Sequence, residues 1–210
     1  MLRYLSGKEL PLFPALADTM FRDRARQFHA RLGWDVTVDH NGWECDDYDA
    51  LNPLYVIWQQ ADGTHGGSMR FLPTVGRTML NDHFANLAGG LRISHPKMWE
   101  CTRFCLNENA APSLSAALLL GGAQLGVGLG LSRAIGVFDA RMVRIYRHLG
   151  WEPMVVGSSG QGAAAVSLGV WEFSEEVRRR MATKAGIATD LSRAWFERAT
   201  GVAAHAVAAR

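Results

Sequence analysis

The sequence has few cysteines and no excess of charge of either sign. Its 210 residues include three cysteines, an odd number, and residues 1–9 lack the apolar stretch of a signal peptide. We therefore expect reduced thiols and a cytoplasmic location. The 22 basic residues are almost balanced by 20 acidic ones, which argues against a protein dedicated to binding nucleic acid.

Long apolar runs are also nearly absent, with one exception. No charged residue occurs from Asn109 to Ser132, a length that could span a bilayer. The segment contains Pro112, Gln124 and five glycines, and Ser113 can cap a helix. We predict a largely buried helix over 113–128 and expect no obligatory membrane association.

The remaining pattern predicts one domain over residues 1–210, without repeats or linkers. Strands and helices alternate along the chain, and 48% of residues are hydrophobic, so we expect an α/β or α+β fold around one central sheet. Strands are predicted at 2–6, 54–59, 67–72, 99–106, 133–138 and 163–172, with an extended piece at 153–157. Helices are predicted at 12–32, 77–88, 113–128 and 140–149, from 174, and at 189–208.

One arginine lies on the apolar side of the first predicted helix. Arg24 is four residues before Phe28 and shares a face with Met20 and Phe21. A guanidinium cannot lose its proton, so burial there requires a carboxylate partner or an anionic ligand. The alternative is a surface arginine whose aliphatic stem covers apolar neighbours.

An acidic cluster follows at Glu44, Asp46, Asp47 and Asp49. In an extended chain Asp47 and Asp49 would share one face, with Glu44 and Asp46 on the other. Such a cluster can hold a metal, a ligand ammonium or a buried arginine, and the alternative is a solvated turn. The spacing of an EF-hand is missing.

A glycine pair precedes a second notable arginine. Gly66 and Gly67 would allow a ligand to approach the backbone closely, and Arg70 follows on a predicted strand. The alternative is a glycine-rich hairpin with an exposed arginine.

Two charged residues interrupt a predicted core strand. Glu100 and Arg103 lie among the apolar residues of 99–106, where unpaired charges are costly. The C-x3-C pair of this strand, Cys101 and Cys105, has no nearby histidine partner, so we expect buried thiols and no metal site.

Taken in order, these elements resemble the acyl-homoserine lactone synthases, the LuxI-type autoinducer synthases of bacterial quorum sensing. The resemblance covers about residues 1–175, with 176–210 as a helical extension beyond it. Its segments are RARQFHARLGWDV (24–36), ECDDYDALNPLYVI (44–57), GGSMRFLPT (66–74), MLNDHF (79–84) and WECTRFCL (99–106).

The resemblance implies a fold similar to the GNAT acyltransferases, with a mixed, split central sheet between helices. It implies transfer of an acyl group from acyl carrier protein or acyl-CoA to the amine of S-adenosylmethionine. Lactone closure then releases 5′-methylthioadenosine. S-adenosylmethionine is a substrate here, so no cofactor or metal is expected, and nucleic acid is not a partner.

The resemblance and the chemistry together assign four groups of residues. The carboxylate and cationic centres of S-adenosylmethionine would contact Arg24, Phe28, Trp34 and Arg70. The catalytic group is Glu100, as the general base, with Arg103, Asp46 and Asp49. The predicted acyl pocket is lined by Met79, Phe84, Phe138, Met142 and Trp171. The predicted docking surface for an acidic carrier comprises Arg141, Arg144, His148 and Arg178.

Three other functions are weighed against this one. A general N-acyltransferase using acyl-CoA usually carries Q-x-x-G-x-G/A at a helix start, and the residues after Gln124 miss that spacing. A non-catalytic binding protein would not need both Glu100 and Arg103. A DNA-binding regulator would need a helix-turn-helix pattern, which the sequence lacks.

Overall fold

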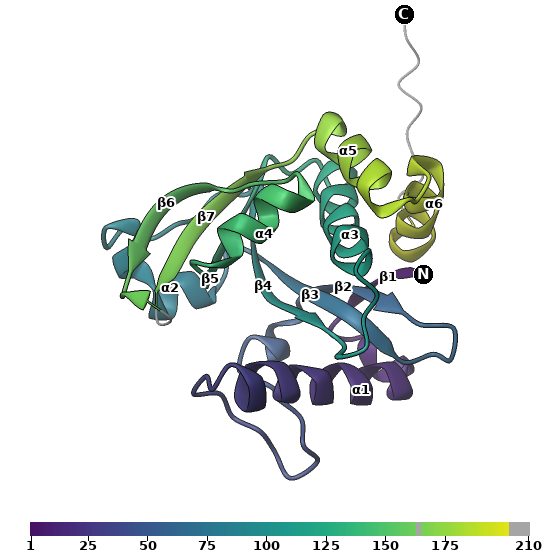
Figure 1. Ribbon diagram of the computed structural model, residues 1–210, viewed down its shortest axis with the longest axis horizontal. Coiled ribbons are helices and arrows are strands. Elements are labelled where there is room, and N and C mark those ends of the chain that lie inside the picture. The colour runs from purple at the N-terminus through teal and green to yellow at the C-terminus, as the bar shows by residue number, and fades with distance from the viewer. Residues whose placement is uncertain (163–164, 202–210) are drawn as a thin grey trace, which may run out of the picture.

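The computed structural model describes residues 1–162 and 165–201. These residues form one mixed sheet of seven strands in the order β1-β2-β3-β4-β5-β7-β6 (Figure 1). The strands are β1 (Leu2–Ser6), β2 (Leu54–Gln59), β3 (His65–Pro73), β4 (Met98–Leu106), β5 (Arg133–Asp139), β6 (Met154–Ser159) and β7 (Val166–Glu172). The six predicted strands are confirmed, and the extended piece at 153–157 belongs to β6. Strand β7 begins at Val166, and residues 163–164 lie outside the described residues.

All neighbouring strands are antiparallel except β4 and β5, which are parallel. This parallel pairing lasts only from Met98, opposite Arg133, to Glu100, opposite Ile135. Beyond it the two strands diverge, as Figure 1 shows. The predicted mixed, split sheet is therefore confirmed.

The helices differ more from the predictions than the strands do. The helix predicted at 12–32 is α1 (Pro14–Arg24) followed by a π-helix, η2 (Ala25–Arg31), and Gly33 ends it at φ +64°. The stretch predicted at 77–88 is a short α2 (Met79–His83) and a 3₁₀ turn, η4 (Ala85–Ala88). The other helices are α3 (Leu114–Gly128), α4 (Met142–Leu149), α5 (Glu175–Ala185) and α6 (Thr189–Thr200), with 3₁₀ turns η1 (Leu10–Leu12) and η3 (Asp49–Leu51). Residues 202–210, included in the predicted last helix, lie outside the described residues.

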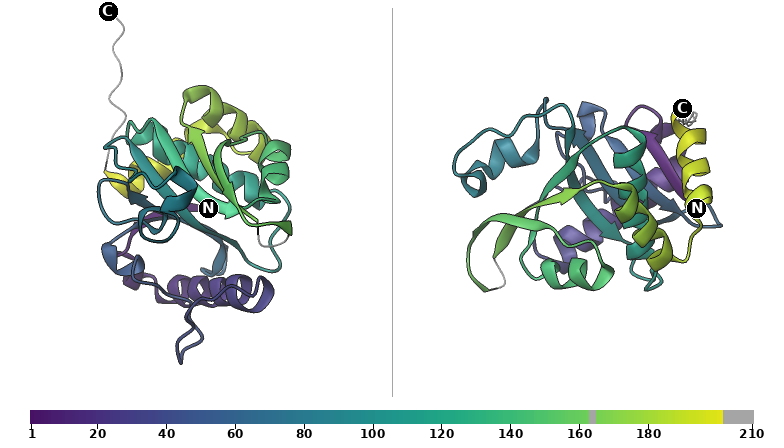
Figure 2. Two further views of the ribbon diagram at one scale, coloured as in Figure 1. Left: turned by 90° about the vertical axis from the view of Figure 1, so that its left-hand side faces the viewer. Right: turned by 90° about the horizontal axis from the view of Figure 1, so that it is seen from above.

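Helices cover both faces of the β1–β4 half of the sheet. Helix α1 packs on β3 and β4 from one side, and α3 packs on β1, β2 and β3 from the other (Figures 1 and 2). Helices α5 and α6 cover the outer side of α3. Because α3 has neighbours on both sides, it is apolar around its circumference.

Close packing explains the glycines of α3. A Cβ atom at Gly126 would lie 2.2 Å from the ring of Phe173, and one at Gly128 would lie 2.3 Å from the ring of Phe196. No helix among the described residues is both long and apolar enough to cross a membrane, and α3 has 15 residues.

Candidate active site

A large cavity opens where β4 and β5 separate. Its volume is about 1840 Å³, and both strands line it, from Cys101 to Leu106 on one wall and from Ala134 to Asp139 on the other. Just after the paired segment the strands still lie close together, because a Cβ atom at Gly136 would lie 2.7 Å from the Cys101 carbonyl oxygen. The split sheet therefore creates a space that main-chain hydrogen bonds would otherwise close.

Beside the cavity, three arginines and three carboxylates form one ion-paired cluster. Its members come from α1, the loop before β2, β3 and β4, and their formal charges cancel. Buried charges persist only when they are paired in this way. The cluster comprises Arg24, Arg70, Arg103, Glu44, Asp46 and Asp49.

Arg24 is enclosed by carboxylates. Its Nε donates to Oε2 of Glu44 at 2.6 Å, and its Nη1 and Nη2 donate to the two oxygens of Asp49 at 2.9 Å each. Its side chain is 1% exposed and does not line the cavity. Of the two interpretations of Arg24, the carboxylate-paired one holds, and its guanidinium faces the cluster rather than the cavity.

Arg70 ties the same carboxylates to the sheet. Its guanidinium donates to both oxygens of Asp46 and, at 2.8 Å, to Oδ1 of Asp49. Its Nε donates to the Thr102 hydroxyl at 3.0 Å. The predicted exposed-arginine alternative is wrong, because Arg70 is 1% exposed.

The glycine pair before Arg70 serves packing. A Cβ atom at Gly66 would lie 2.9 Å from Trp58, and one at Gly67 would lie 2.9 Å from Leu106 and Leu118. The predicted close approach of backbone to a ligand is therefore not what these glycines provide.

The acidic segment does not adopt the extended conformation considered above. The main-chain N–H of Asp49 bonds back to the carbonyl of Asp46, and η3 starts there. This turn brings Glu44, Asp46 and Asp49 to the same side, whereas Asp47 is exposed. The predicted pairing of Asp47 with Asp49 on one face is wrong because the chain turns at that point.

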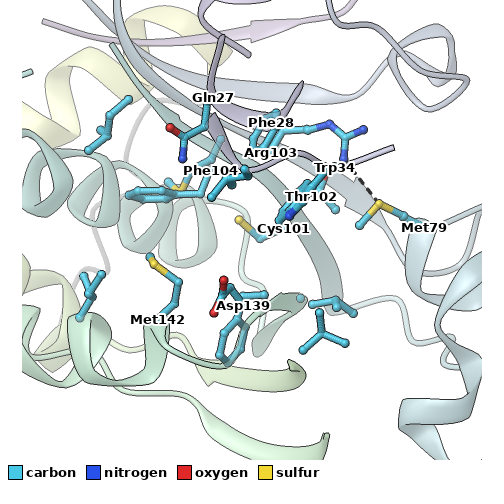
Figure 3. A pocket seen from close by; sticks show the side chains of 18 of the residues that line it. Gln27, Phe28, Trp34, Met79, Cys101, Thr102, Arg103, Phe104, Asp139 and Met142 are labelled. Carbon is cyan, nitrogen blue, oxygen red and sulfur yellow. Dashed lines mark hydrogen bonds between the residues drawn. The ribbon is translucent and has the colours of Figure 1, made fainter. Parts of the chain in front are cut away.

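Arg103 lines the cavity, whereas Arg24 and Arg70 are not among the described residues that line it. Its Nη2 donates to Oε1 of Glu44 at 2.7 Å and lies 2.8 Å from Oδ2 of Asp46. Its guanidinium carbon lies 5.3 Å from the centre of the Phe28 ring, which stacks on Trp34 at 5.1 Å. Its Nη1 points toward Met79 Sδ, 3.7 Å away (Figure 3).

Burial and the arginines oppose each other at Asp49. Burial alone would raise the pKa of this carboxyl, but Arg24 and Arg70 hold it far below its ordinary value. The Tyr55 hydroxyl donates to Asp49 at 2.7 Å and stabilises the charged form further. Asp49 is therefore negatively charged at neutral pH, and it lies behind the cavity wall.

Glu100 lies behind the cavity wall formed by α2. Its carboxylate accepts the backbone N–H groups of Met79 at 3.0 Å and Leu80 at 2.6 Å, and so it holds the start of α2. It is 1% exposed and does not line the cavity, whereas Met79 does. Burial raises the pKa of Glu100, and the two N–H groups only partly oppose this.

All five residues of the predicted acyl pocket lie in the cavity wall: Met79, Phe84, Phe138, Met142 and Trp171. Figure 3 shows Met142 on the side of the cavity opposite Cys101 and Phe104. The inner wall of the cavity includes Leu119 and Gly122 of α3, which belong to the uncharged stretch 110–130 that we expect to form a wall of the acyl pocket, and Trp151.

The predicted docking surface is only partly at the surface. Arg144 and His148 are exposed on α4, and Arg141 is exposed but paired with Asp139. The predicted docking role of Arg178 is wrong. Its side chain is only 5% exposed, and it donates to Glu175 at 2.8 Å and to Gln124 at 3.1 Å. A buried arginine that pairs within its own fold cannot dock a carrier.

Glu44 belongs to the predicted acidic cluster, but the sequence assigned it no catalytic or binding role. It is 0% exposed and joins Arg24 to Arg103. The available signal was its place in the acidic segment, which supplies one carboxylate for each arginine. No cluster of three or more metal-ligating side chains occurs among the described residues.

Comparisons with known proteins agree with this geometry. A family described as autoinducer synthase matches residues 12–181. The acyl-homoserine-lactone synthase of Rhizobium etli is 38% identical over 183 residues, covering 84% of this chain and 86% of that protein. The structure of a CoA-dependent acyl-homoserine lactone synthase, BjaI, with SAM and isopentyl-CoA has a TM-score of 0.80 at 18% identity, over 89% of this chain and 90% of that chain. An acyl-CoA N-acyltransferase from Pseudomonas aeruginosa has a TM-score of 0.56 at 13% identity, over 81% of this chain and 98% of that chain.

The split sheet with its cavity defines the class as a GNAT-like acyltransferase fold. Within that class, the chain belongs to the autoinducer synthase family. It is an enzyme, an acyltransferase that synthesises an acyl-homoserine lactone for quorum sensing. The alternative of a general N-acyltransferase fits less specifically, because the structure of the Pseudomonas aeruginosa N-acyltransferase has a lower TM-score than that of BjaI. Gln124 lies inside α3, buried against Arg178, and not at the helix start where those enzymes carry their motif.

Proposed function

We propose that the enzyme joins S-adenosylmethionine to an acyl group carried as a thioester on acyl carrier protein or on coenzyme A. The observation that carries this proposal is the composition of the cavity. Arg103, Asp46 and the Phe28–Trp34 stack lie on its polar wall, and apolar side chains line most of its remaining surface. An amino-acid head with a sulfonium needs the first surface, and an acyl chain needs the second.

Each charged part of S-adenosylmethionine has a complementary group there. The Arg103 guanidinium attracts the substrate carboxylate, and Asp46 attracts the ammonium. The faces of Phe28 and Trp34 suit the sulfonium. Arg24, Arg70, Asp49 and Glu44 act one layer behind, because they fix the positions of Arg103 and Asp46.

The first step makes an amide bond. The substrate ammonium loses a first proton, its nitrogen attacks the thioester carbon, and the nitrogen loses a second proton as the carbon–sulfur bond breaks. The released thiolate takes up one of these two protons to give the free carrier thiol, and the other is released. Glu100 is the proposed proton acceptor, directly or through water, since its raised pKa suits a general base. Access requires the first turn of α2 to release one of its carboxylate oxygens.

The second step closes the lactone. An oxygen of the substrate carboxylate attacks the γ-carbon, and the carbon–sulfur bond of the sulfonium breaks. The neutral sulfide 5′-methylthioadenosine leaves with the bonding electron pair, so no further proton, cofactor or oxidant is needed. The whole reaction releases one proton.

The proposed location is the cytoplasm. The three cysteines are free thiols, as proteins in reducing compartments usually have. An acidic acyl carrier protein would dock on the exposed basic side of α4, at Arg144 and His148. Acyl-CoA, with its phosphates, suits the same charge.

One experiment tests the proposal. The protein is incubated with S-adenosylmethionine and a panel of acyl carriers, and mass spectrometry follows 5′-methylthioadenosine and acyl-homoserine lactone. Both products should appear together with at least one donor. Amide formed on another amine without methylthioadenosine would instead support the general N-acyltransferase, and no product with any donor would contradict the proposal.

A further inference from the structure

A tyrosine that the reaction above does not use lies in the wall of the acyl side of the cavity. Tyr146, on α4, is 6% exposed and lines the cavity. Its ring makes edge-to-face contacts with Phe138 at 5.4 Å and with Trp171 at 5.1 Å. Met142, one turn earlier on α4, lines the same space (Figure 3). The phenol is therefore held in one orientation by aromatic packing.

The hydroxyl of Tyr146 differs from those of the other tyrosines. The chain has four tyrosines. The hydroxyl of Tyr4 donates to the Gly121 carbonyl at 3.3 Å, that of Tyr48 to Asp82 at 2.9 Å and that of Tyr55 to Asp49 at 2.7 Å. Tyr146 has no hydrogen-bond partner among residues 1–162 and 165–201, and its oxygen is not one of their enclosed unpaired atoms. The free hydroxyl therefore opens on the cavity.

Tyr146 lies near the point where β4 and β5 separate: its ring contacts Trp171, which pairs with Ala134 next to the end of the β4–β5 pairing. The attacked thioester carbonyl must come within reach of the proposed base Glu100, which ends that pairing. The pKa of Tyr146 is raised, mainly by burial and to a smaller extent by the neighbouring Cys101 thiol. The hydroxyl therefore keeps its proton and can donate a hydrogen bond. Cys101 directly follows Glu100, the last residue of β4 paired with β5. With the thioester at that point, the hydroxyl is nearer to the first carbons of the acyl chain than to its end.

A free donor in this position distinguishes between acyl chains. An unsubstituted chain displaces water from the cavity and leaves the phenol without a partner, which carries the cost of an unmade hydrogen bond. A chain with an oxygen on C3 supplies an acceptor two carbons beyond the carbonyl.

We propose that the Tyr146 hydroxyl donates a hydrogen bond to an oxygen on C3 of the acyl chain. The enzyme then prefers 3-hydroxyacyl or 3-oxoacyl donors to the unsubstituted chain of the same length. This inference rests on the proposed function and specifies its substrate class.

The test compares kcat/KM for three donors of equal chain length: unsubstituted, 3-hydroxy and 3-oxo. The wild-type enzyme should favour at least one oxygenated donor by about tenfold, the usual effect of one neutral hydrogen bond. Tyr146→Phe keeps the ring contacts and should reduce this ratio about tenfold. The whole loss should fall on the oxygenated donor.

Tyr4→Phe is the matched control, because the Tyr4 hydroxyl bonds to Gly121 and does not line the cavity. This variant should keep the wild-type ratio. An unchanged ratio in Tyr146→Phe, or an equal loss with all three donors, overturns the inference and assigns the hydroxyl to packing or to the thioester itself. A wild-type enzyme without any preference also overturns it, even if the variant does not fold. Absence of methylthioadenosine with every donor contradicts the proposed function instead.

Discussion

Nη2 of Arg103 lies 2.7 Å from Oε1 of Glu44, and this ion pair accompanies an unusual backbone conformation. Arg103 has φ +54°, in the left-handed region that residues other than glycine rarely adopt. Such a conformation costs about 1–3 kcal/mol and persists when surrounding contacts compensate for it. Glu44, Asp46 and the Phe28 ring supply those contacts.

Glu44→Gln should therefore destabilise the protein strongly. The change leaves Arg24 and Arg103 with too little negative charge in a buried place, and breaking a buried pair costs about 3–5 kcal/mol. Urea unfolding measures the effect. Asp47→Asn, an exposed acid of the same segment, is the control and should change the free energy of unfolding by less than about 0.5 kcal/mol. Equal effects of the two changes would contradict the role given to Glu44.

Asp49 should make stability depend on acid pH. Its pKa in the folded protein lies below that of the unfolded chain, so its ion pairs stabilise the fold above about pH 4. The contribution is lost as the pH falls below that value. The difference between the unfolding free energies of wild type and Asp49→Asn, measured from pH 7 to pH 3, should therefore stay constant down to about pH 4 and begin to shrink below it. Two curves of unfolding free energy that stay parallel down to pH 3 would contradict this explanation.

Glu100→Gln should slow acyl transfer by about 10²-fold or more while S-adenosylmethionine binding changes little. Because burial raises the pKa of Glu100, the acid limb of kcat/KM should lie above pH 4.3, the ordinary glutamate value, and disappear in the variant. Stopped-flow or discontinuous assays from pH 5 to 9 and calorimetric titration of S-adenosylmethionine measure the two effects.

A control separates this role from support of α2, because Glu100 also bonds to the first N–H groups of that helix. The Thr78 hydroxyl caps the same helix by accepting the Asn81 N–H at 3.3 Å. Thr78→Ala should cost about 1 kcal/mol of stability and keep the acid limb. If Glu100→Gln abolishes S-adenosylmethionine binding, Glu100 is a structural residue.

The strands could be predicted from the sequence because their patterns are local. Alternation and turn residues place β2 and β3 within two residues of their true bounds. The division of the first helix into α1 and a π-helix could not be predicted, since a period of 3.6 fits both segments.

The residue types of the candidate site could be predicted from the sequence. Which of these side chains line the cavity and which pair with one another behind its wall could not. Arg24 requires a charged partner wherever it is buried, and sequence alone leaves open whether that partner is Asp49 or a ligand. Tertiary contacts decide it, since Glu44 and Arg103 are 59 residues apart. Arg178 shows the reverse case: a basic run predicts a solvated surface, and one member turns inward to Gln124.

Arg144→Glu should weaken carrier docking without affecting S-adenosylmethionine. Arg144 is exposed on α4, so charge reversal should raise KM for the acyl carrier about fivefold, the effect of roughly 1 kcal/mol. Steady-state kinetics with each substrate varied in turn measure this, at low and high salt. Arg198→Glu on α6, also exposed, is the control and should change neither KM. Equal increases in both KM values for Arg144→Glu would reject docking on α4.

Gly122 should set the depth of the acyl pocket. It lies in the inner cavity wall, where an added Cβ atom would approach Met69 at 3.2 Å, Phe71 at 3.4 Å and Trp151 at 3.9 Å. Gly122→Ala fits with a small shift of the flexible Met69 side chain and should keep the wild-type range of donors. Gly122→Leu fills the inner end, so kcat/KM should fall for the longest acyl donors and stay unchanged for the shortest. A donor series of increasing length, with products quantified by mass spectrometry, distinguishes the two variants, and an equal loss at every length would mean that the chain does not reach α3.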